Sequence, residues 1–336
     1  MDALQPHPAT FTEKLKAHIE LLDPITWVGV LQGTICGAIA SGGFTLTTEN
    51  IGKFALLTLL LGPLGTGFAQ SINDYYDRDL DRINDPVRPI PSGRISETES
   101  VWNWSITGLL SLIAGAVLAL QLSGSRQLIM LGITLFGFVM GYIYSAPPLK
   151  LKRNVLTSAP VVGLTYSLMT WIAGNIIFTD LRPEVIWMGV INMFVAIGLI
   201  FLNDFKSVEG DRSAGLKSLP IMIGVRNTYL VSFAIIDVPL AGFALLMLTW
   251  WGFGWVFIFS LLSFAAILYM QLRLYLDPKD GALAWDNAIH NTGLRNVIAK
   301  SDVKEHRAFL RYLVVNNGLY VINVVIAAVL LASKPR

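Results

Sequence analysis

Long apolar stretches recur along almost the whole chain, and the polar residues gather between them. A helix that crosses a membrane needs about 20 mostly apolar residues. Nine stretches meet that length, at residues 26–46, 53–72, 103–123, 127–147, 155–178, 184–203, 229–249, 253–275 and 309–332. The pattern therefore predicts an all-α integral membrane protein with nine transmembrane helices.

The same pattern predicts how the chain is organised. Residues 1–25 form an N-terminal tail, and FTEKLKAHIELL within it has apolar residues at helical spacing, which predicts a helix along the membrane surface. Residues 26–332 are expected to form a single nine-helix domain, and residues 333–336 a short C-terminal tail. The polar loops of this domain are residues 73–102, 148–154, 203–228 and 277–308.

The basic residues predict the orientation of the helices. If the N-terminus is cytoplasmic, 20 of the 25 lysines and arginines fall on the cytoplasmic side. The five on the other side are Lys53, Arg126, Arg182, Lys334 and Arg336. Because membrane proteins concentrate positive charge in their cytoplasmic loops, this bias places the N-terminus inside and the C-terminus on the opposite side. All four polar loops then face the cytoplasm.

Composition agrees with a membrane protein and excludes other classes. Of the 336 residues, 54% are hydrophobic and 14% charged, whereas about a quarter of a soluble domain is charged. A net charge of +2 gives no reason to expect nucleic acid as a partner. The single cysteine, Cys36, lies in an apolar stretch, which excludes a disulfide framework. The first 24 residues lack the pattern of a secretory signal.

A dense run of acidic residues, NDYYDRDLDRIND (73–85), follows directly on the second apolar stretch. An α-helix turns by about 100° per residue, so four of its oxygen-bearing side chains share one face, while Asp79 points away. The four are Asn73, Asp74, Asp77 and Asp81. The helix is expected to end before Asp85, because a proline disfavours helical geometry in the residue that precedes it.

A related run, NDFKSVEGD (203–211), follows the sixth apolar stretch. Asn203, Asp204 and Asp211 stand 130 positions after Asn73, Asp74 and Asp81, which indicates a weak internal repeat. Carboxylates on successive helical turns suit Mg²⁺, which also takes phosphate oxygens of a substrate as ligands. The two clusters predict two or more Mg²⁺ ions bridging a diphosphate. The predicted ligands are Asn73, Asp74, Asp77, Asp81, Asp204 and Asp211.

Polar and basic residues beside the acids are predicted to bind the diphosphate, because arginine and lysine suit phosphate oxygens. They are Asn73, Arg78, Arg82, Arg88, Lys152, Asn203, Lys206 and Arg212. Lys150 is predicted to reach a phosphate and Tyr144 a developing carbocation. The alternatives are that these cations neutralise the acids or contact lipid headgroups, and that Tyr144 belongs to an aromatic belt. Two clusters in matching register favour a functional site over a solvated cap.

On these residues the chain resembles the UbiA superfamily of intramembrane prenyltransferases, whose first motif has the form NDxxDxxxD. Three stretches are most similar to the chlorophyll and bacteriochlorophyll synthase branch: RPIPSGRIS (88–96), YSAPPLKLK (144–152) and NDFKSVEGDRSAGLKSLP (203–220). The sequence departs from the usual second motif, because Ser207 stands where many members have an aspartate. Asp204 and Glu209 are both open as its replacement. Tyr144 and Lys150 are also further apart than in the common YxxxK pattern.

The resemblance implies Mg²⁺-dependent transfer of a phytyl, geranylgeranyl or farnesyl group from its diphosphate to the propionate of chlorophyllide or bacteriochlorophyllide. Asp74, Asp77, Asp81, Asp204, Asp211, Tyr144 and Lys150 are then the catalytic residues. The resemblance also implies a photosynthetic membrane, with other photosynthetic membrane proteins as further partners. Alternatives are a UbiA-type enzyme with a quinone precursor, haem or glycerol-phosphate lipid as acceptor, and a secondary transporter.

Overall fold

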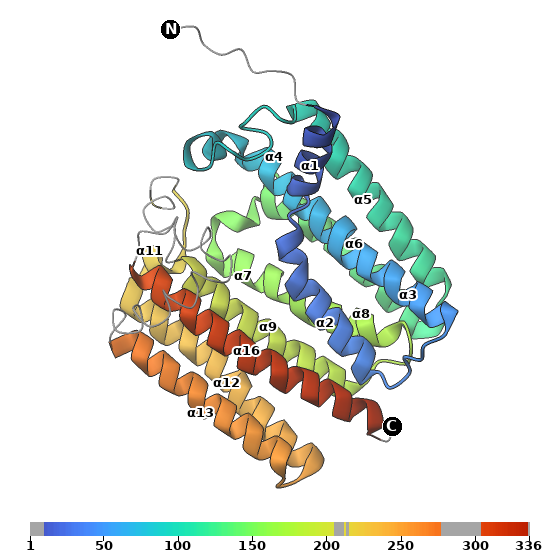
Figure 1. Ribbon diagram of the computed structural model, residues 1–336, viewed down its shortest axis with the longest axis vertical. Helices are drawn as coiled ribbons and strands as arrows, with labels where there is room; N and C mark the ends of the chain where they lie inside the picture. The colour runs from blue at the N-terminus through green and yellow to red at the C-terminus, as the bar shows by residue number, and fades with distance from the viewer. Residues whose placement is uncertain (1–9, 205–211, 213–214, 277–303, 335–336) are drawn as a thin grey trace, which may run out of the picture. The chain divides into compact units, whose positions relative to one another are not determined.

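The computed structural model describes residues 10–204, 212, 215–276 and 304–334 of the chain, without the side chains of residues 83, 84, 304–311 and 313 (Figure 1). Within these ranges there is no β-strand, and nine helical stretches are long and apolar enough to cross a membrane. The nine are Phe11–Ala40, Thr48–Arg82, Glu97–Leu120, Gly124–Ser145, Val155–Ile176, Pro183–Asn203, Val225–Trp251, Trp255–Leu276 and Val314–Ser333. The predicted all-α fold with nine spans is confirmed for the described residues.

The first predicted stretch, 26–46, is longer than the helix that it forms. Helix α2 (Trp27–Ala40) ends earlier, and Gly42 follows it with a φ of +65°, a backbone conformation that favours glycine. The next helix, α3 (Thr48–Leu59), begins where the Thr47 side chain accepts a hydrogen bond from the Asn50 N–H. Apolar composition continues through this turn, which is why hydrophobicity alone overestimated the helix.

The predicted N-terminal helix is present as α1 (Phe11–Leu21). It begins with a capping box, in which Thr10 and Glu13 satisfy each other's backbone N–H groups. One side of α1 is buried through Ala17 and Leu21, whereas Phe11 is exposed. Its location on a membrane surface stays a prediction.

The chain divides into two compact units, each described by itself. The first comprises residues 1–152 and 172–181. Its helices are α1, α2, α3, the π-helical turn η2 (Leu60–Thr66), α4 (Gly67–Asn84), α5 (Glu97–Leu120), α6 (Gly124–Ser145) and the last part of α8 (Met169–Ile176). Helix α4 packs against both α5 and α6, and α1 contacts α4 and α5. The prediction of a single domain is not tested by this division.

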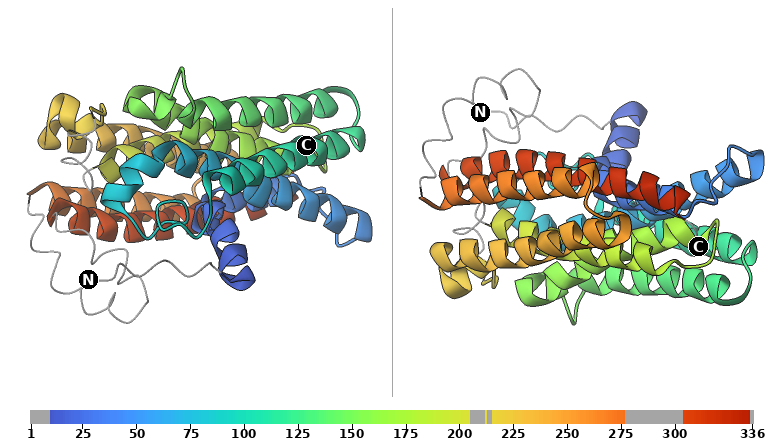
Figure 2. Two further views of the ribbon diagram at one scale, coloured as in Figure 1. Left: turned by 90° about the horizontal axis from the view of Figure 1, so that it is seen from above. Right: turned by 90° about the horizontal axis from the view of Figure 1, so that it is seen from below.

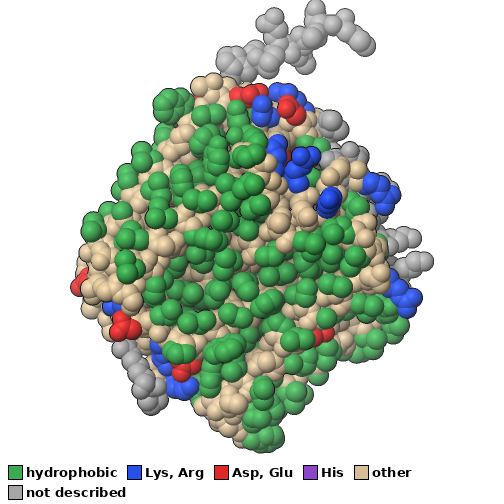
Figure 3. Space-filling model, turned by 180° about the vertical axis from the view of Figure 1, so that it is seen from behind, with side chains coloured by type: hydrophobic (Ala, Val, Ile, Leu, Met, Phe, Trp, Pro, Cys, Tyr) green, Lys and Arg blue, Asp and Glu red, His purple; other side chains and the backbone are tan. Residues whose placement is uncertain are grey.

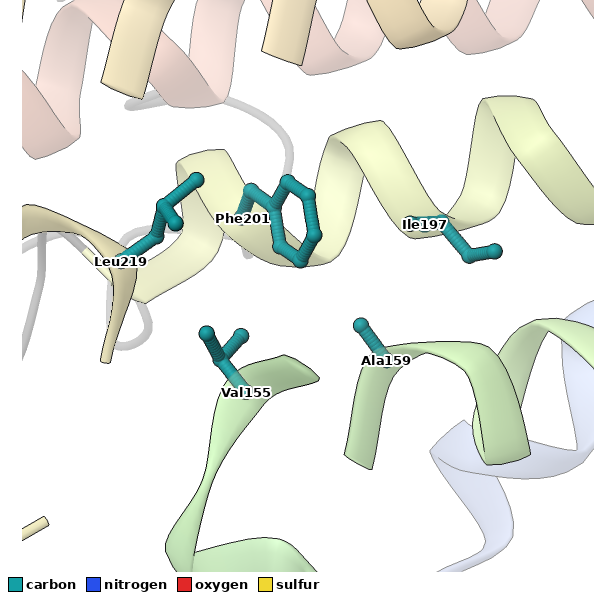
Figure 4. Packing of buried hydrophobic residues seen from close by; sticks show 5 residues of the cluster. All are labelled: Val155, Ala159, Ile197, Phe201 and Leu219. Carbon is teal, nitrogen blue, oxygen red and sulfur yellow. The ribbon is translucent and has the colours of Figure 1, made fainter. Parts of the chain in front are cut away.

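The second unit comprises residues 153–171 and 182–336. Its elements are α7 (Val155–Gly163), η4 (Leu164–Leu168), the start of α8, α9 (Pro183–Asn203), α11 (Leu219–Ile223), α12 (Val225–Trp251), α13 (Trp255–Leu276) and α16 (Lys304–Ser333). Helix α12 packs along α9 and α13, and α13 packs along α16 (Figure 2). A buried cluster joins α7, α9 and α11 through Val155, Ala159, Ile197, Phe201 and Leu219 (Figure 4).

Apolar side chains also cover much of the helix surface (Figure 3). Trp102, Leu120, Val238 and Leu262 are each more than 60% exposed. Large apolar side chains at such exposure are unfavourable in water and favourable against lipid. Their distribution agrees with helices that cross a bilayer.

Close backbone contact between α2 and α8 in the first unit depends on Gly174. A Cβ atom at this position would lie 2.3 Å from the Thr34 carbonyl oxygen and 2.8 Å from the Ala38 nitrogen. Gly174→Ala is therefore expected to destabilise the protein by about 2 kcal/mol through overpacking. The thermal unfolding midpoint in detergent measures the effect.

Gly132→Ala is the matched control, because a Cβ there has no neighbour within 4 Å. Within helix α6, alanine is the better helix former by about 0.5–1 kcal/mol, so the control is expected to be unchanged or slightly stabilised. Equal midpoints for the two variants would contradict the close contact at Gly174.

Candidate active site

Helix α4 carries the whole first acidic motif. It ends at Asn84, and Asp85 leaves helical geometry with φ −147° and ψ 70°, which confirms the predicted helix end. The Asp85 N–H still donates to the Asp81 carbonyl at 2.8 Å, and the Arg88 N–H donates to the Asp85 carbonyl at 3.1 Å. The chain therefore turns back at once, and this turn brings Arg88 towards the helix that precedes it.

Arg88 lies between two carboxylates of the acidic face. Its Nη1 atom is 2.6 Å from Asp74 Oδ1 and 3.5 Å from Asp81 Oδ2. Both aspartate side chains are only 13% exposed. They are seven residues apart, which is about two helical turns, so one guanidinium reaches both.

The electrostatics of Arg88 follow from this placement. Burial by itself would lower the pKa of the Arg88 guanidinium, but nearby carboxylates outweigh burial and raise that pKa. In order of their effect these carboxylates are Asp74, Asp81, Asp85 and Asp23. Arg88 is therefore the counter-ion of an acidic cluster.

Lys152 supplies the second cation. Its Nζ atom is 2.6 Å from Asp77 Oδ2 and 2.7 Å from Asn73 Oδ1, and Ser145 Oγ donates to the same Asn73 oxygen at 3.0 Å. Burial lowers the pKa of the Lys152 ammonium, and the Asp77 carboxylate offsets this only in part. Lys152 is therefore the counter-ion of Asp77, as Arg88 is of Asp74 and Asp81.

The acidic face fits a hard divalent cation in its chemistry. All its donors are oxygens, and Oδ2 of Asp81 is buried and accepts no hydrogen bond from any residue that the structure describes. Within the described ranges, however, no three Asp, Glu, His or Cys side chains lie close enough to hold one ion by themselves. An ion at this face would complete its shell with amide, water or phosphate oxygens, as Mg²⁺ commonly does.

Arg78 and Arg82 pair with acidic residues outside the acidic face. Arg78 Nε is 3.1 Å from Glu97 Oε1 on α5, and Arg82 Nη1 is 2.7 Å from Asp79 Oδ1. Asp79 is 72% exposed, which confirms that it points away from the acidic face. This placement favours the alternative role for both arginines, the neutralisation of neighbouring acids.

The end of α6 and the segment that follows it place Tyr144, Lys150 and Lys152 in different surroundings. Tyr144 is partly buried near the end of α6. Lys150 has a positive φ of 42°, and its Nζ lies 5.7 Å from the centre of the Tyr76 ring. Only Lys152 has a described contact to Asp77. Roles for Tyr144 and Lys150 stay predictions.

The second motif belongs to the second unit. Asn203 is the last residue of α9, and Asp204 follows as its C-cap, with its N–H donating to the Leu202 carbonyl. Arg212 is exposed. Lys206, Ser207, Glu209 and Asp211 lie outside the described residues. Of the two ligands predicted in this motif, Asp204 is therefore located at the end of α9 and Asp211 is not.

Asp23 was missed by the sequence analysis. It follows α1 with a φ of +46°, an uncommon conformation for a residue other than glycine, and its carboxylate interacts electrostatically with Arg88. It lies 51 positions before Asp74 and belongs to no motif. An aspartate followed by a proline at the end of a short helix was the only local signal.

Comparison with known proteins gives consistent results for family and fold. Residues 25–290 match the UbiA prenyltransferase family. Chlorophyll synthase of Arabidopsis thaliana is 41% identical over 239 residues, which are 68% of this chain and 58% of that protein. The chain thus spans less than two thirds of the plant relatives it matches.

Two other relatives and one solved structure extend the comparison. The bacteriochlorophyll synthase 33 kDa chain of Rhodobacter capsulatus is 36% identical over 62% of this chain and 67% of its own length. Digeranylgeranylglyceryl phosphate synthase of Natronomonas pharaonis is 30% identical over 81% of this chain and 92% of its own length. A UbiA homologue of Archaeoglobus fulgidus bound to GPP and Mg²⁺ shares the fold, with a TM-score of 0.62 at 21% identity, covering 93% of this chain and 99% of that one.

Proposed function

This chain belongs to the UbiA prenyltransferase family, and on that premise we propose that it esterifies the propionate of a chlorophyllide or bacteriochlorophyllide with a prenyl group. The donor is a phytyl, geranylgeranyl or farnesyl diphosphate. The observation that carries the proposal is the α4 acidic face with Arg88 and Lys152 within 2.6 Å of its carboxylates. The similarity to chlorophyll and bacteriochlorophyll synthases supports the choice of acceptor.

We assign Mg²⁺ to the oxygen donors of the two motifs. They are Asn73, Asp74, Asp77 and Asp81 of the first motif, with Asp204 and Asp211 of the second. The homologue bound to GPP and Mg²⁺ supports the choice of a divalent cation. When bound, Mg²⁺ supplies positive charge that stabilises the departing diphosphate. Two or more ions are part of the proposal.

Cationic side chains of the protein also stabilise the departing diphosphate. Arg88 and Lys152 already lie at the acidic face, paired with Asp74 and Asp77. When the diphosphate binds, each cation replaces a carboxylate oxygen partner with a phosphate oxygen. The bond between the first prenyl carbon and the diphosphate oxygen breaks, and its electron pair leaves with the diphosphate. A propionate oxygen then bonds to that carbon and forms the ester.

The acceptor requires no dedicated general base. A propionate has a pKa of about 4 to 5, so it is ionised at neutral pH and attacks without losing a proton. Water competes for the developing carbocation, and the apolar helices around the prenyl chain exclude it.

The proposed membrane follows from the similarity to chlorophyll and bacteriochlorophyll synthases, and the proposed orientation follows from the charge distribution. The protein lies in a photosynthetic membrane, with its N-terminus and the acidic face on the cytoplasmic or stromal side and the C-terminus opposite. Contacts with other photosynthetic membrane proteins are a further part of the proposal.

A second acceptor class has specific support. The chain covers 92% of digeranylgeranylglyceryl phosphate synthase of Natronomonas pharaonis, a larger share than of the plant chlorophyll synthases. A glycerol-phosphate lipid is therefore the competing acceptor. Family membership removes the support for a secondary transporter.

Purified protein in detergent, tested with chlorophyllides crossed with prenyl diphosphates, is expected to form a pigment ester with one preferred pair. Chromatography of the pigments measures the product. A prenylated glycerol-phosphate lipid without any pigment ester would contradict the proposed acceptor and support its competitor.

Removal of divalent metal is expected to abolish ester formation, because the diphosphate then departs without its counter-charge. Added EDTA should stop the reaction, and excess Mg²⁺ should restore it. Ester formation at an unchanged rate in EDTA would contradict the assignment of Mg²⁺ to these carboxylates.

A further inference from the structure

Arg88 lies on a loop, so its position depends on what holds that loop. Residues 85–96 connect α4 to α5. Besides the bond from Arg88 N to Asp85 O, three backbone hydrogen bonds shape the loop. They run from Ser92 N to Arg88 O at 3.0 Å, from Gly93 N to Ile90 O at 3.1 Å and from Ile95 N to Pro89 O at 3.2 Å. Gly93 has a φ of +74°, which favours glycine at this turn.

Helix α1 packs on this loop through apolar side chains. Ile90 and Ile95 of the loop are 6% and 1% exposed, and they form one buried cluster with Ala17 and Leu21 of α1. Tyr75 of α4 packs against the same cluster. One side of the loop is therefore packed against α1 and α4.

A polar contact joins α1 to the residue beside Arg88. Arg94 Nη1 and Nη2 donate to the two Glu20 carboxylate oxygens at 2.7 and 2.9 Å, and Nη2 also donates to the Val87 carbonyl at 2.6 Å. One guanidinium thus bonds to α1 and to the backbone that precedes Arg88. The bidentate pairing of Arg94 with Glu20 restrains the direction as well as the distance between the loop and α1.

Helix α1 is itself fixed to the rest of the first unit. Lys14 Nζ lies 2.6 Å from Glu99 Oε1 on α5, and Asn103 Nδ2 of α5 donates to the His18 carbonyl at 3.3 Å. At the other end of α1, Ser71 Oγ of α4 donates to the Leu21 carbonyl at 3.2 Å. Helix α1 is therefore held in place by α4 and α5, and the loop packs against it.

We propose that Glu20 and Arg94 are positioning residues that hold the 85–96 loop so that Arg88 is aligned with Asp74 and Asp81. The inference rests on the proposed function for its kinetic consequences. Glu20 and Arg94 are 46% and 32% exposed, and ion pairs at such exposure contribute little to folding stability. Their effect is instead on geometry, because a small misplacement of a catalytic group costs much of its rate contribution.

Glu20→Gln is expected to lower kcat/KM for the prenyl diphosphate about 10-fold, mainly through a higher KM, with little change in the thermal unfolding midpoint. In an Arg88→Gln background, Glu20→Gln should cause no further loss, because its effect acts through Arg88. Glu49→Gln is the matched control, since it removes the Glu49–Lys53 pair of α3, whose 2.6 Å distance is close to the 2.7 Å of the Glu20–Arg94 pair. The control should leave kcat/KM unchanged.

Backbone hydrogen exchange gives a readout that is independent of turnover. In Glu20→Gln, the amides of Ser92, Gly93 and Ile95 should exchange at least about 10-fold faster, because the loop opens more often. Unchanged exchange would overturn the proposal, as would an additive loss in the Arg88→Gln background. If the wild-type protein forms no pigment ester, the proposed function fails, while faster loop exchange in Glu20→Gln would still support the positioning of the loop.

Discussion

Asp81→Asn is expected to lower the rate of ester formation by about 100- to 1,000-fold, which is the cost of removing one preorganised charge contact at a reacting site. Asp81 is buried on the acidic face, and its Oδ2 atom lies 3.5 Å from Arg88 Nη1. Asparagine keeps the size of the side chain and one oxygen but removes the negative charge. The affinity for Mg²⁺ should fall by about 10- to 100-fold, so part of the activity should return at high Mg²⁺.

The matched control is Asp79→Asn on the same helix. Asp79 is 72% exposed and pairs with Arg82 at 2.7 Å, so it lies outside the acidic face. The rate of ester formation by Asp79→Asn is expected to stay within about twofold of the wild-type rate, since exposed ion pairs contribute little to stability. Initial rates at several Mg²⁺ concentrations measure both variants. Near-normal turnover of correctly folded Asp81→Asn would show that this carboxylate is not part of the reaction site.

Arg88→Gln is expected to reduce kcat/KM for the prenyl diphosphate by about 100-fold, with KM raised more than kcat is lowered. The physical reason is the loss of a guanidinium that bridges Asp74 and Asp81 and that we propose contacts the diphosphate. The two carboxylates also lose their shared counter-ion, so their mutual repulsion increases. Arg88→Lys keeps the charge without the planar fork and should recover only part of the loss.

Arg153→Gln serves as the control for this substitution, because Arg153 is exposed and lies one residue after Lys152. Its kinetic constants should match those of the wild type. Steady-state rates over a range of prenyl diphosphate concentrations separate KM from kcat. If Arg88→Gln had a normal KM and a normal kcat, the assignment of Arg88 to the diphosphate would be wrong.

Helical periodicity explains why the acidic face itself could be predicted. Asn73, Asp74, Asp77 and Asp81 share one face because of the fixed rotation per residue, which is a property of the backbone alone. The end of α4 before Asp85 depends on the proline that follows, which is again local. The spans could also be predicted from the sequence alone, because the thickness of the bilayer sets how many consecutive apolar residues a spanning helix needs.

The partners of that face could not be predicted in the same way. Basic residues at helical spacing suggested Arg78 and Arg82 as diphosphate ligands, yet the structure turns both towards Glu97 of α5. Which acid a long arginine side chain reaches depends on how α4 and α5 pack, and spacing along one helix contains no information on the neighbouring helix.

The sequence by itself therefore determined the class of the protein, the positions of its spans and the chemistry of the α4 face. Only the tertiary structure decided that Arg88 and Lys152 compensate this face, from 14 and 75 positions away along the chain. It also brought Asp23 and Glu20 of the N-terminal segment to the Arg88 loop. The physical reason is that periodicity is fixed within each helix, whereas contacts between distant segments depend on the packing of all the helices around them.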